Sequence, residues 1–352
     1  MNYKEKISNK IVQVTQSIIR ALKIMDAQKV KLLYVYDNDV FVSILTIGDI
    51  QRAIIANVDL NASIRGILDF DKKYASPSDS LEDIKQKMLS LKAESMPVLN
   101  EDNELVDVYL WEDFFDNQEK RERRKLSLPV VIMAGGKGIR LQPLTNIIPK
   151  PLIPIGEKTI VETILDQFES IGCDQFYMSV NYKSEVLEYY FDHLTRKYDI
   201  TFFKEDKPLG TIGSVTLLKN KISTPFFVSN CDILIDQDFI EVYDYHVVNK
   251  NDLTIITSVK SYQIPYGVIQ TGEDGIMEGL SEKPEMTYMI NTGVYIIQPE
   301  LINEIPENQF FHITELMEKV KQRGGKIGCF PVSEKSWTDI GDWKEYLRII
   351  NK

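Results

Sequence analysis

A glycine-rich stretch that carries basic residues contains the residue types best suited to chemistry. It reads MAGGKGIRLQPLT at residues 133–145, and PKPL follows at residues 149–152. Its small residues are Ala134, Gly135, Gly136 and Gly138. Because glycine has no Cβ, the N–H groups of such a loop can turn towards a di- or triphosphate, and Arg140 and Lys150 would add mobile positive charge. The spacing predicts a phosphate-binding loop, although it matches neither G-x-G-x-x-G nor the P-loop, which needs Gly-Lys-Ser/Thr.

Two aspartates, Asp232 and Asp339, each lie where a predicted strand ends. Asp232 closes NCD after the apolar run 225–228, and Asp339 lies in WTDIG at residues 337–341. Two carboxylates together can hold Mg²⁺, a hard ion that prefers carboxylate and phosphate oxygens. A single aspartate at such a place more often caps a helix or lies in a solvated loop. The prediction of a magnesium site therefore depends on the pair.

The elements that must position these residues begin at Leu128, where short apolar runs alternate with helix-like segments. The predicted strands are 130–133, 175–180, 200–203 and 225–228, and the predicted helices are 161–171 and 185–197. This alternation predicts an α/β sheet with right-handed crossovers. In such sheets ligands bind beyond the carboxyl ends of the strands, which is where the glycine-rich stretch and Asp232 lie.

The first third of the chain contains an internal repeat of helix, strand, strand and helix. Met88 falls 63 residues after Met25, and after a one-residue slip Asp113 falls 64 residues after Asp49. We therefore expect a pair of α+β repeats at about residues 7–60 and 70–116.

A charged run, EKRERRK at residues 119–125, follows the repeats. It has no apolar face, so we expect a solvated linker or a helix extension; the interspersed acidic residues argue against a polyanion-binding role. The expected domains are 1–118 and 128–352, with a linker at 119–127.

The composition excludes several function classes. Of the 352 residues, 41 are Lys or Arg and 52 are Asp or Glu, which gives a net charge of −11 and argues against broad nucleic-acid binding. The three cysteines, Cys173, Cys231 and Cys329, are widely spaced and odd in number, which indicates a reducing compartment and no disulfide framework. No signal-peptide core and no apolar run near the ~18 residues of a membrane span occur, so we expect a soluble, cytoplasmic protein without a membrane partner.

From residue 128 onward the chain resembles the sugar-1-phosphate nucleotidylyltransferases, whose signature has the form AGGxGTRLxPLT followed by PKPL. Further matches occur in family order: PLGTIG at 208–213, NCD at 230–232, YGVI at 266–269, EKP at 282–284, NTG at 291–293 and WTDIG at 337–341. One departure is Ile139, which stands where the family usually has Thr and so removes a hydroxyl from the loop. The resemblance implies a Rossmann-like, GT-A-like mixed sheet.

The resemblance also implies the reaction and its residues. A nucleoside triphosphate and a sugar 1-phosphate would give a nucleotide sugar and pyrophosphate, with Mg²⁺ as cofactor. The second pKa of a phosphate monoester is about 6, so the sugar phosphate is already mostly a dianion and needs no general base. This agrees with only three histidines, His193, His246 and His312, none of which lies beside a nucleophile-like motif.

The roles transfer residue by residue onto the matching positions. Arg140 would contact the leaving phosphates, Lys150 the α-phosphate and Lys283 the sugar phosphate. Asp232 and Asp339 would hold the metal. The remaining positions would bind the rest of the two substrates: Glu282, Asn291 and Gly267 the sugar, and Glu205 and Gly210 the base and ribose. Glu205 has an alternative interpretation as an ordinary strand-end carboxylate.

The choice of nucleotide and sugar rests on finer resemblances. The loop at 209–213 is similar to the LGTAG or LGTGG loop of guanylyltransferases, which favours GTP over the nucleotides of thymidylyl and uridylyl enzymes. A repeat pair before a compact catalytic domain resembles glucosamine-1-phosphate guanylyltransferases of legionaminic acid synthesis. Mannose, heptose or glucose 1-phosphate with another nucleotide remains an alternative. A non-catalytic paralogue that binds sugar nucleotides is disfavoured, because such proteins typically lose the residues retained here at positions 140, 150, 232 and 339.

The N-terminal repeat resembles a CBS-domain pair, a regulatory module that often binds adenine nucleotides and self-associates. The resemblance implies nucleotide contacts at Thr46 and Asp49, and a homo-oligomer. The second copy has Leu110 where the first has Thr46, so at most one complete half-site is expected. The alternative is that Thr46 and Asp49 only cap the helix that follows them.

Overall fold

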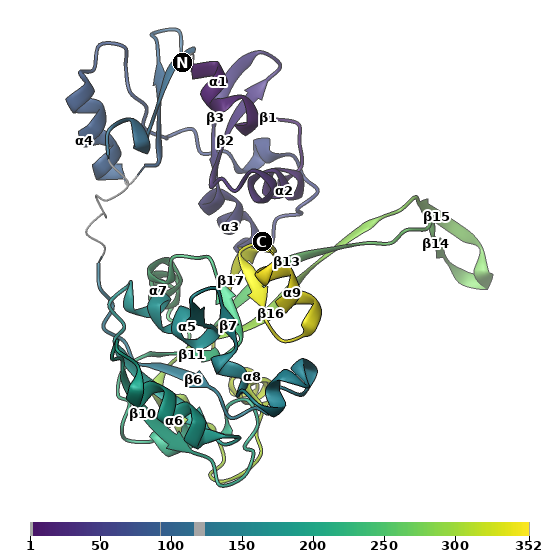
Figure 1. Cartoon of the computed structure of the whole chain (residues 1–352). Helices are drawn as coiled ribbons and strands as arrows, with labels where there is room; N and C mark the ends of the chain where they lie inside the picture. Colours follow the sequence, from purple (N-terminus) through teal and green to yellow (C-terminus); the bar gives the residue numbers. More distant parts are fainter. Residues whose placement is uncertain (1–2, 92, 116–123, 352) are drawn as a thin grey trace. The chain divides into compact units, whose positions relative to one another are not determined.

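The computed structural model describes residues 3–91, 93–115 and 124–351. The chain divides into two compact units, Met1–Glu122 (unit 1) and Arg123–Lys352 (unit 2) (Figure 1). Of the predicted linker, residues 119–123 lie outside the described part. Residues 124–127 belong to unit 2, since Arg124 pairs with Asp244 and Leu126 N–H donates to the Ile171 carbonyl. Within the described ranges, no helix is long and apolar enough to cross a membrane.

Unit 1 begins with one copy of the repeat and continues with the second. The first copy contains α1 (Tyr3–Ile7), β1 (Ile11–Gln13), α2 (Ile18–Gln28), β2 (Leu32–Asp37), β3 (Val40–Thr46) and α3 (Ile47–Ile55); the second contains α4 (Leu81–Leu91), β4 (Ser95–Leu99), β5 (Leu105–Leu110) and the short 3₁₀ helix η3 (Trp111–Asp113). Ser17 caps α2 by accepting a hydrogen bond from Arg20 N–H, and the apolar face of α2 is buried.

Strand register follows the same spacing as the sequence repeat. In the first copy Val12 pairs with Val35 in parallel, and the β2–β3 pairing has an irregularity after Val35. Sixty-three residues later Ala75 pairs with Val98 in parallel, and the β4–β5 pairing has its irregularity after Val98. The two copies therefore share backbone detail as well as sequence pattern.

A seven-stranded sheet forms the centre of unit 2, in the order β10-β9-β6-β11-β16-β13-β17. Its strands are β6 (Val130–Met133), β9 (Gln175–Val180), β10 (Asp199–Lys204), β11 (Phe226–Asn230), β13 (Leu253–Gln263), β16 (Glu285–Ile297) and β17 (Ile327–Ser333). Only β16 runs antiparallel to its neighbours in this sheet. The structure thus confirms the predicted mixed α/β sheet.

Helices cover both faces of the sheet. Successive side chains of a strand point to opposite faces, and in the buried strands both sets are apolar, so each face needs a covering layer. Val130 packs with one hydrophobic core and Val131 with the other. Residues of α5 (Ile160–Glu169), α6 (Ser184–His193), α7 (Phe239–Val248) and α9 (Trp343–Ile350) join the first core, and residues of the 3₁₀ helix η7 (Gly213–Leu218) and of α8 (Ile313–Gln322) join the second.

A long two-stranded ribbon leaves the sheet of unit 2. The outer parts of β13 and β16 continue into a hairpin made of β14 (Val268–Thr271) and β15 (Met277–Ser281), which pair only with each other. We call residues 261–288 the arm. Figure 1 shows it projecting from the sheet, with the hairpin at its far end.

His246 is a buried structural histidine on α7. Its Nδ1 lies 2.8 Å from Thr254 Oγ1 and its Nε2 lies 3.1 Å from the amide of Gln298. Burial lowers the pKa of His246 to about 4. The folded protein therefore holds this ring neutral at pH values where the unfolded chain would protonate it.

We expect this burial to make unit 2 less stable as the pH falls from about 6.5 towards 4. The pKa of His246 is lower in the folded state than in the unfolded state, so the unfolded state binds more protons in this window. The free energy of unfolding should therefore fall by on the order of 3 kcal/mol. Urea unfolding at pH 7.5 and pH 4.5 should show a smaller pH dependence for His246→Gln than for the wild type. The exposed His193→Gln serves as the control, and an equal pH dependence in His246→Gln would contradict the prediction.

Candidate active site

The glycine-rich loop and Asp232 leave the sheet at the same edge. Strands β6 and β11 are parallel neighbours, with Met133 opposite Asn230, so their carboxyl ends lie side by side. Gly138 has φ +62°, and a Cβ there would lie 2.8 Å from Thr145 Cγ2 and 3.0 Å from Lys150 Cβ. Only glycine fits this close turn without strain. The Thr145 hydroxyl then donates to the Gly138 carbonyl at 2.9 Å and fixes the loop.

A small sheet brings the two aspartates together. Strand β12 (Ile233–Ile235) runs antiparallel to β18 (Trp337–Asp339), with Ile233 opposite Asp339. The Ile340 N–H also donates to the Asp232 carbonyl at 2.9 Å. A Cβ on Gly341 would lie 2.5 Å from Arg140 Nη2 and 2.6 Å from Asp339 Oδ1, so this glycine lets the guanidinium and the carboxylate approach closely.

The charges at this edge are arranged around Asp232. Lys150, on the 3₁₀ helix η6 (Lys150–Leu152), forms an ion pair with Asp232, and each side chain is only 11% exposed. Asp339 Oδ1 is buried and has no hydrogen-bond partner in the described structure. Burial and the neighbouring Asp232 raise the pKa of Asp339 above its usual range, while Lys150 and Arg140 oppose the shift. Asp339 is thus a carboxylate whose ionised form needs more positive charge than the protein supplies.

These residues fit a divalent cation. An unpartnered carboxylate oxygen beside a second carboxylate is the arrangement that bound Mg²⁺ would stabilise. The described ranges hold no cluster of three or more His, Cys, Asp or Glu that could form an all-protein metal site. Mg²⁺ often binds through one or two carboxylates and substrate phosphates, so a pair is sufficient.

Glu205 links the glycine-rich loop to the loop predicted to bind the base. One of its carboxylate oxygens accepts from the Ser179 hydroxyl and the other from the Leu209 N–H at 3.0 Å. A Cβ on Gly135 would lie 3.1 Å from Glu205 Oε1. Glu205 therefore has structural partners on both oxygens, as its strand-end interpretation anticipates, and it also lies directly behind the predicted phosphate loop.

Two residues near this carboxylate were missed by sequence reasoning. Ser179 lies at the end of β9, and the Asn181 amide just beyond it donates to the Glu205 carbonyl at 2.7 Å. The signal was available, because both are polar residues at the carboxyl end of an otherwise apolar strand next to β6.

Gly210 is held against the segment that precedes α8. Its φ is +83°, and a Cβ would lie 2.5 Å from the Phe311 carbonyl oxygen. The Thr211 hydroxyl accepts from the Ile313 N–H at 2.9 Å, which satisfies a free donor at the start of α8. The 209–213 loop is therefore rigidly fixed to residues 311–313.

The residues predicted to bind the sugar separate into two places. Asn291 lies at the site edge, since its side-chain oxygen accepts from the Gly293 N–H at 3.0 Å, and a Cβ on Gly293 would lie 2.4 Å from Asn230 Nδ2. The other three, Gly267, Glu282 and Lys283, lie on the arm. Gly267 lies beside the carboxylate of Glu282 there, and the structure does not bring these residues to Lys150 and Asp232.

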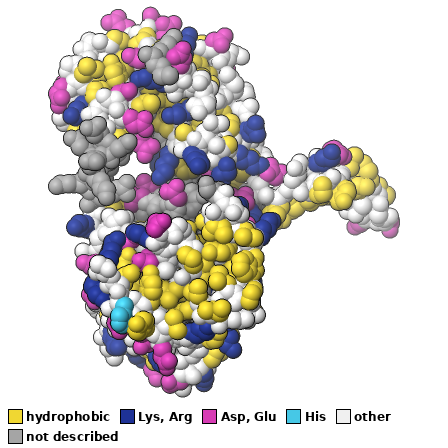
Figure 2. Space-filling view, in the orientation of Figure 1, with side chains coloured by type: hydrophobic (Ala, Val, Ile, Leu, Met, Phe, Trp, Pro, Cys, Tyr) yellow, Lys and Arg dark blue, Asp and Glu magenta, His cyan; other side chains and the backbone are white. Residues whose placement is uncertain are grey.

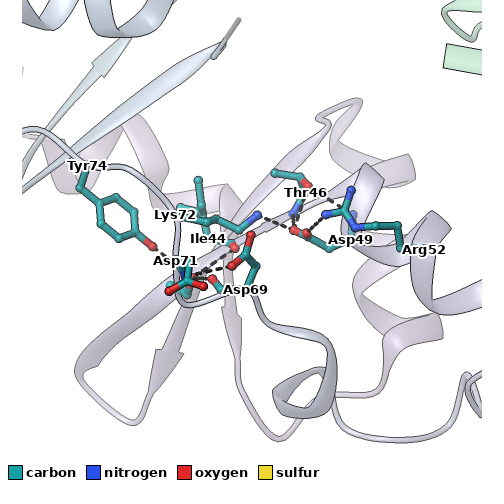
Figure 3. A network of polar contacts seen from close by, with 9 residues as sticks. Ile44, Thr46, Asp49, Arg52, Asp69, Asp71, Lys72 and Tyr74 are labelled. Atoms are coloured by element: carbon teal, nitrogen blue, oxygen red, sulfur yellow. Dashed lines mark hydrogen bonds and ion pairs between the residues drawn. The ribbon is translucent and has the colours of Figure 1, made fainter. Parts of the chain in front are cut away.

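In unit 1, Thr46 and Asp49 are engaged with each other and with basic residues (Figure 3). The Thr46 hydroxyl and N–H both donate to Asp49 Oδ2, at 2.8 and 2.7 Å, and the Asp49 N–H donates back at 3.3 Å. Lys72 donates to the same carboxylate at 2.6 Å, and Arg52 pairs with its other oxygen. Burial opposes ionisation, but the hydrogen bonds from Lys72 and Thr46 lower the pKa of Asp49. These contacts are those of a helix cap.

Sequence comparison assigns unit 2 to a known family. The nucleotidyl transferase family profile matches residues 129–352, which is more than half of the chain and contains the whole cluster around Asp232. The chain belongs to the nucleotidyl transferase family. All of unit 1 lies outside this match.

Relatives of this nucleotidyl transferase family member include two fungal proteins named mannose-1-phosphate guanyltransferase. The protein from Pichia angusta is 30% identical over 232 residues, which cover 62% of each chain, and the protein from Yarrowia lipolytica is 32% identical over 226 residues, covering 62% of this chain and 61% of the relative. The chain thus spans about three fifths of the length of these relatives. A solved Bacillus anthracis structure, described as a glucose-1-phosphate thymidylyltransferase, shares the fold with a TM-score of 0.50, 18% identity, and coverage of 64% of this chain and 94% of that one.

Proposed function

We propose that this protein is a sugar-1-phosphate guanylyltransferase, which transfers GMP from GTP to a sugar 1-phosphate and releases pyrophosphate. The observation that carries the proposal is the joint position of Lys150, Asp232, Asp339 and Arg140 at the mouth of the glycine-rich loop. A non-catalytic binding protein would have no need of the unpartnered, buried carboxylate of Asp339.

The reaction needs charge neutralisation and alignment more than proton transfer. A phosphate oxygen of the sugar 1-phosphate forms the bond to the α-phosphorus as the bond from that phosphorus to the β-phosphate oxygen breaks, and pyrophosphate leaves with the electron pair. Lys150 would hold the α-phosphate, and Arg140 would stabilise the charge that develops on the leaving phosphates. The N–H groups of the loop at 134–138 would hold the triphosphate in line.

Asp232 and Asp339 would hold Mg²⁺. The bound ion would neutralise phosphate charge in the transition state. The role of Asp232 is then double, since it also fixes the Lys150 ammonium beside the α-phosphate position.

We expect GTP to exceed ATP by at least tenfold in kcat/KM. Buried polar groups built for guanine would be left unpaired by adenine, at about 1 to 3 kcal/mol each. The similarity of the 209–213 loop to guanylyltransferases and the names of the fungal relatives support this choice. The measurement is pyrophosphate release with each common nucleotide, and equal or better use of dTTP, UTP or CTP would contradict it.

For the sugar we propose glucosamine 1-phosphate, on the resemblance to enzymes that combine an N-terminal repeat pair with this catalytic domain in legionaminic acid synthesis. The names of the fungal relatives make mannose 1-phosphate the main alternative, and heptose and glucose 1-phosphates complete the panel. The same pyrophosphate assay tests all four. Turnover with none of them would reject the enzymatic proposal in favour of a non-catalytic paralogue.

We also propose that unit 1 is a CBS-domain pair and that the protein is a cytoplasmic homo-oligomer. The shared register of its two copies supports the repeat, and the free state of the three cysteines supports a reducing compartment. A regulatory nucleotide at Thr46 and Asp49 would have to compete with Lys72 and Arg52 for Asp49.

Calorimetry of the full chain with AMP and ATP tests this regulatory nucleotide. If the site binds, AMP should give heat at submillimolar concentration that Thr46→Val abolishes, and the coupling should change turnover several-fold. Thr163→Val, which alters a hydroxyl on α5 of unit 2, is the control. No heat at millimolar AMP would leave the repeat pair as a structural or dimerisation element.

A further inference from the structure

The arm exposes apolar side chains along its whole length. Figure 2 shows hydrophobic side chains on the part that projects from the body. None of the residues 261–288 is buried. The large apolar side chains that are at least 46% exposed are Tyr262, Tyr266, Ile269, Ile276, Met277, Leu280, Met286 and Tyr288. A two-stranded ribbon of this kind is at best marginally stable in water without a surface to pack against.

The arm also carries Glu282 and Lys283, which the proposed function requires at the active site around Asp232. Lys283 is its single basic residue, with φ +46°, and it follows Glu282, whose carboxylate lies beside Gly267. The ribbon leaves the sheet at Lys260, which contacts the ring of Trp337 and lies opposite Tyr288. Tyr288 lies six positions after Glu282, which is about 20 Å along an extended strand. A lysine side chain cannot span that distance back to the body.

The ribbon is regular up to Gln263 and Glu285, and Lys283 lies beyond this regular part, in the interval before the hairpin of β14 and β15. The pairing of β13 with β16 runs in continuous register from Thr257 opposite Asn291 to Gln263 opposite Glu285, and its irregularity lies earlier, between Ile255 and Thr257.

The cluster around Asp232 at the edge of the sheet carries too little positive charge to neutralise two phosphorylated substrates. Asp232 and Asp339 stand beside Lys150 and Arg140, so the charges of these four side chains cancel, and the glycine-rich loop adds only Lys137. A nucleoside triphosphate and a sugar phosphate dianion would leave a negative excess even with one divalent cation bound. A further cation near the sugar phosphate would stabilise the complex.

We propose that the arm packs on a second copy of this chain and places Lys283 and Glu282 in that copy's active site, where they bind the sugar phosphate and the sugar. This inference rests on the proposed function. The exposed apolar side chains present on the order of 1,000 Å² for each copy, which matches the roughly 800 Å² per partner of a stable interface. In a two-fold dimer both arms exchange at once, so each site takes its nucleotide residues from one chain and its sugar residues from the other.

The association of the full chain is tested first, by light scattering after gel filtration. Ile269 and Leu280 lie opposite each other on the hairpin, and both are 59% exposed. The double variant Ile269→Asp/Leu280→Asp should halve the mass of the assembly without unfolding it. Val248→Asp, at an apolar position on α7 that is 79% exposed, should leave the mass unchanged. An unchanged mass in the double variant, or a monomeric wild type, would overturn the proposed interface.

Active-site sharing is tested with dimers purified through two different tags. One chain carries Lys150→Met and the other Lys283→Asn, an exchange that tolerates positive φ. Each variant alone should retain about 1% of the wild-type turnover or less. In the mixed dimer one of the two sites combines an intact body with an intact arm, so we expect about half of the wild-type turnover. If each arm served its own chain, every site would carry a lesion and the mixed dimer would be no more active than either variant alone. Full activity of Lys283→Asn alone would also overturn the assignment.

Failure of this inference is distinguishable from failure of the proposed function. A wild type that releases no pyrophosphate with any nucleotide and sugar phosphate would reject the function, while the mass measurement still decides whether the arm joins two copies. An active wild type with an inactive mixed dimer rejects only the sharing of the site.

Discussion

Asp232→Asn is expected to lower kcat by at least about 100-fold while the protein stays folded. The substitution keeps the size of the side chain but removes the charge that would hold the cation and that positions the Lys150 ammonium. It leaves Asp339 without its partner carboxylate, so the metal would have one charged ligand in place of two. The measurement is steady-state turnover with GTP over a range of Mg²⁺ concentrations, together with a thermal unfolding curve.

The matched control is Asp244→Asn. That carboxylate lies on α7, is exposed and forms an ion pair with Arg124, away from the loop. Its loss should leave kcat unchanged. Wild-type kcat in Asp232→Asn would refute the assignment of the metal site, whereas unfolding of the variant would be visible in the melting curve.

Lys150→Met should lower kcat by a similar factor and also move the acidic limb of the pH profile to higher pH. Burial and Asp232 already raise the pKa of Asp339, and Lys150 lowers it. Removing Lys150 therefore raises this pKa further. Because the ionised carboxylate is the form that would bind the cation, activity should appear only at higher pH than in the wild type.

The measurement for this second variant is kcat/KM from pH 5 to 9 at saturating Mg²⁺. Lys158→Met is its control, since Lys158 forms an exposed ion pair with Asp166 outside the site. A Lys150→Met profile with the acidic limb of the wild type would show that Lys150 does not act on Asp339.

The sequence was sufficient to predict the part of the site that strand ends determine. Parallel strands align their carboxyl ends at one edge, so the apolar runs before the glycine loop and before Asp232 placed both motifs together. Asp339 reaches the same edge by pairing across β12 and β18. That pairing joins segments about a hundred residues apart, and only the family resemblance indicated it.

Contacts between strands distant in sequence account for what could not be predicted. The place of Ser179 and Asn181 at a strand end could be read from the sequence, but their partner Glu205 could not, because it lies on the loop after the neighbouring strand and no local pattern encodes that pairing. The arm shows a similar limit. Strands were not predicted at 261–288, and the sequence does not show whether the apolar side chains there pack within the chain or outside it.

Thr46 and Asp49 illustrate an ambiguity of short motifs. The same Thr-x-x-Asp spacing suits a nucleotide contact and a helix cap, and the structure shows the hydrogen bonds of a cap at the start of α3. Lys72, which occupies the Asp49 carboxylate, lies 23 residues away in the chain and could not be paired with it from the sequence.

The fixed contact between the 209–213 loop and the segment before α8 has a consequence for redesign. Added side-chain atoms at Gly210 or Gly213 would collide with the backbone oxygens of Phe311 or Gln309, which cannot move as a side chain could. Replacing this loop alone with a loop that carries side chains at positions 210 and 213 would therefore create a clash with the backbone of residues 309–311. The proposed function assigns base selection to this loop, so a redesign would have to transplant residues 309–313 together with it, although the two segments lie about a hundred residues apart in the chain.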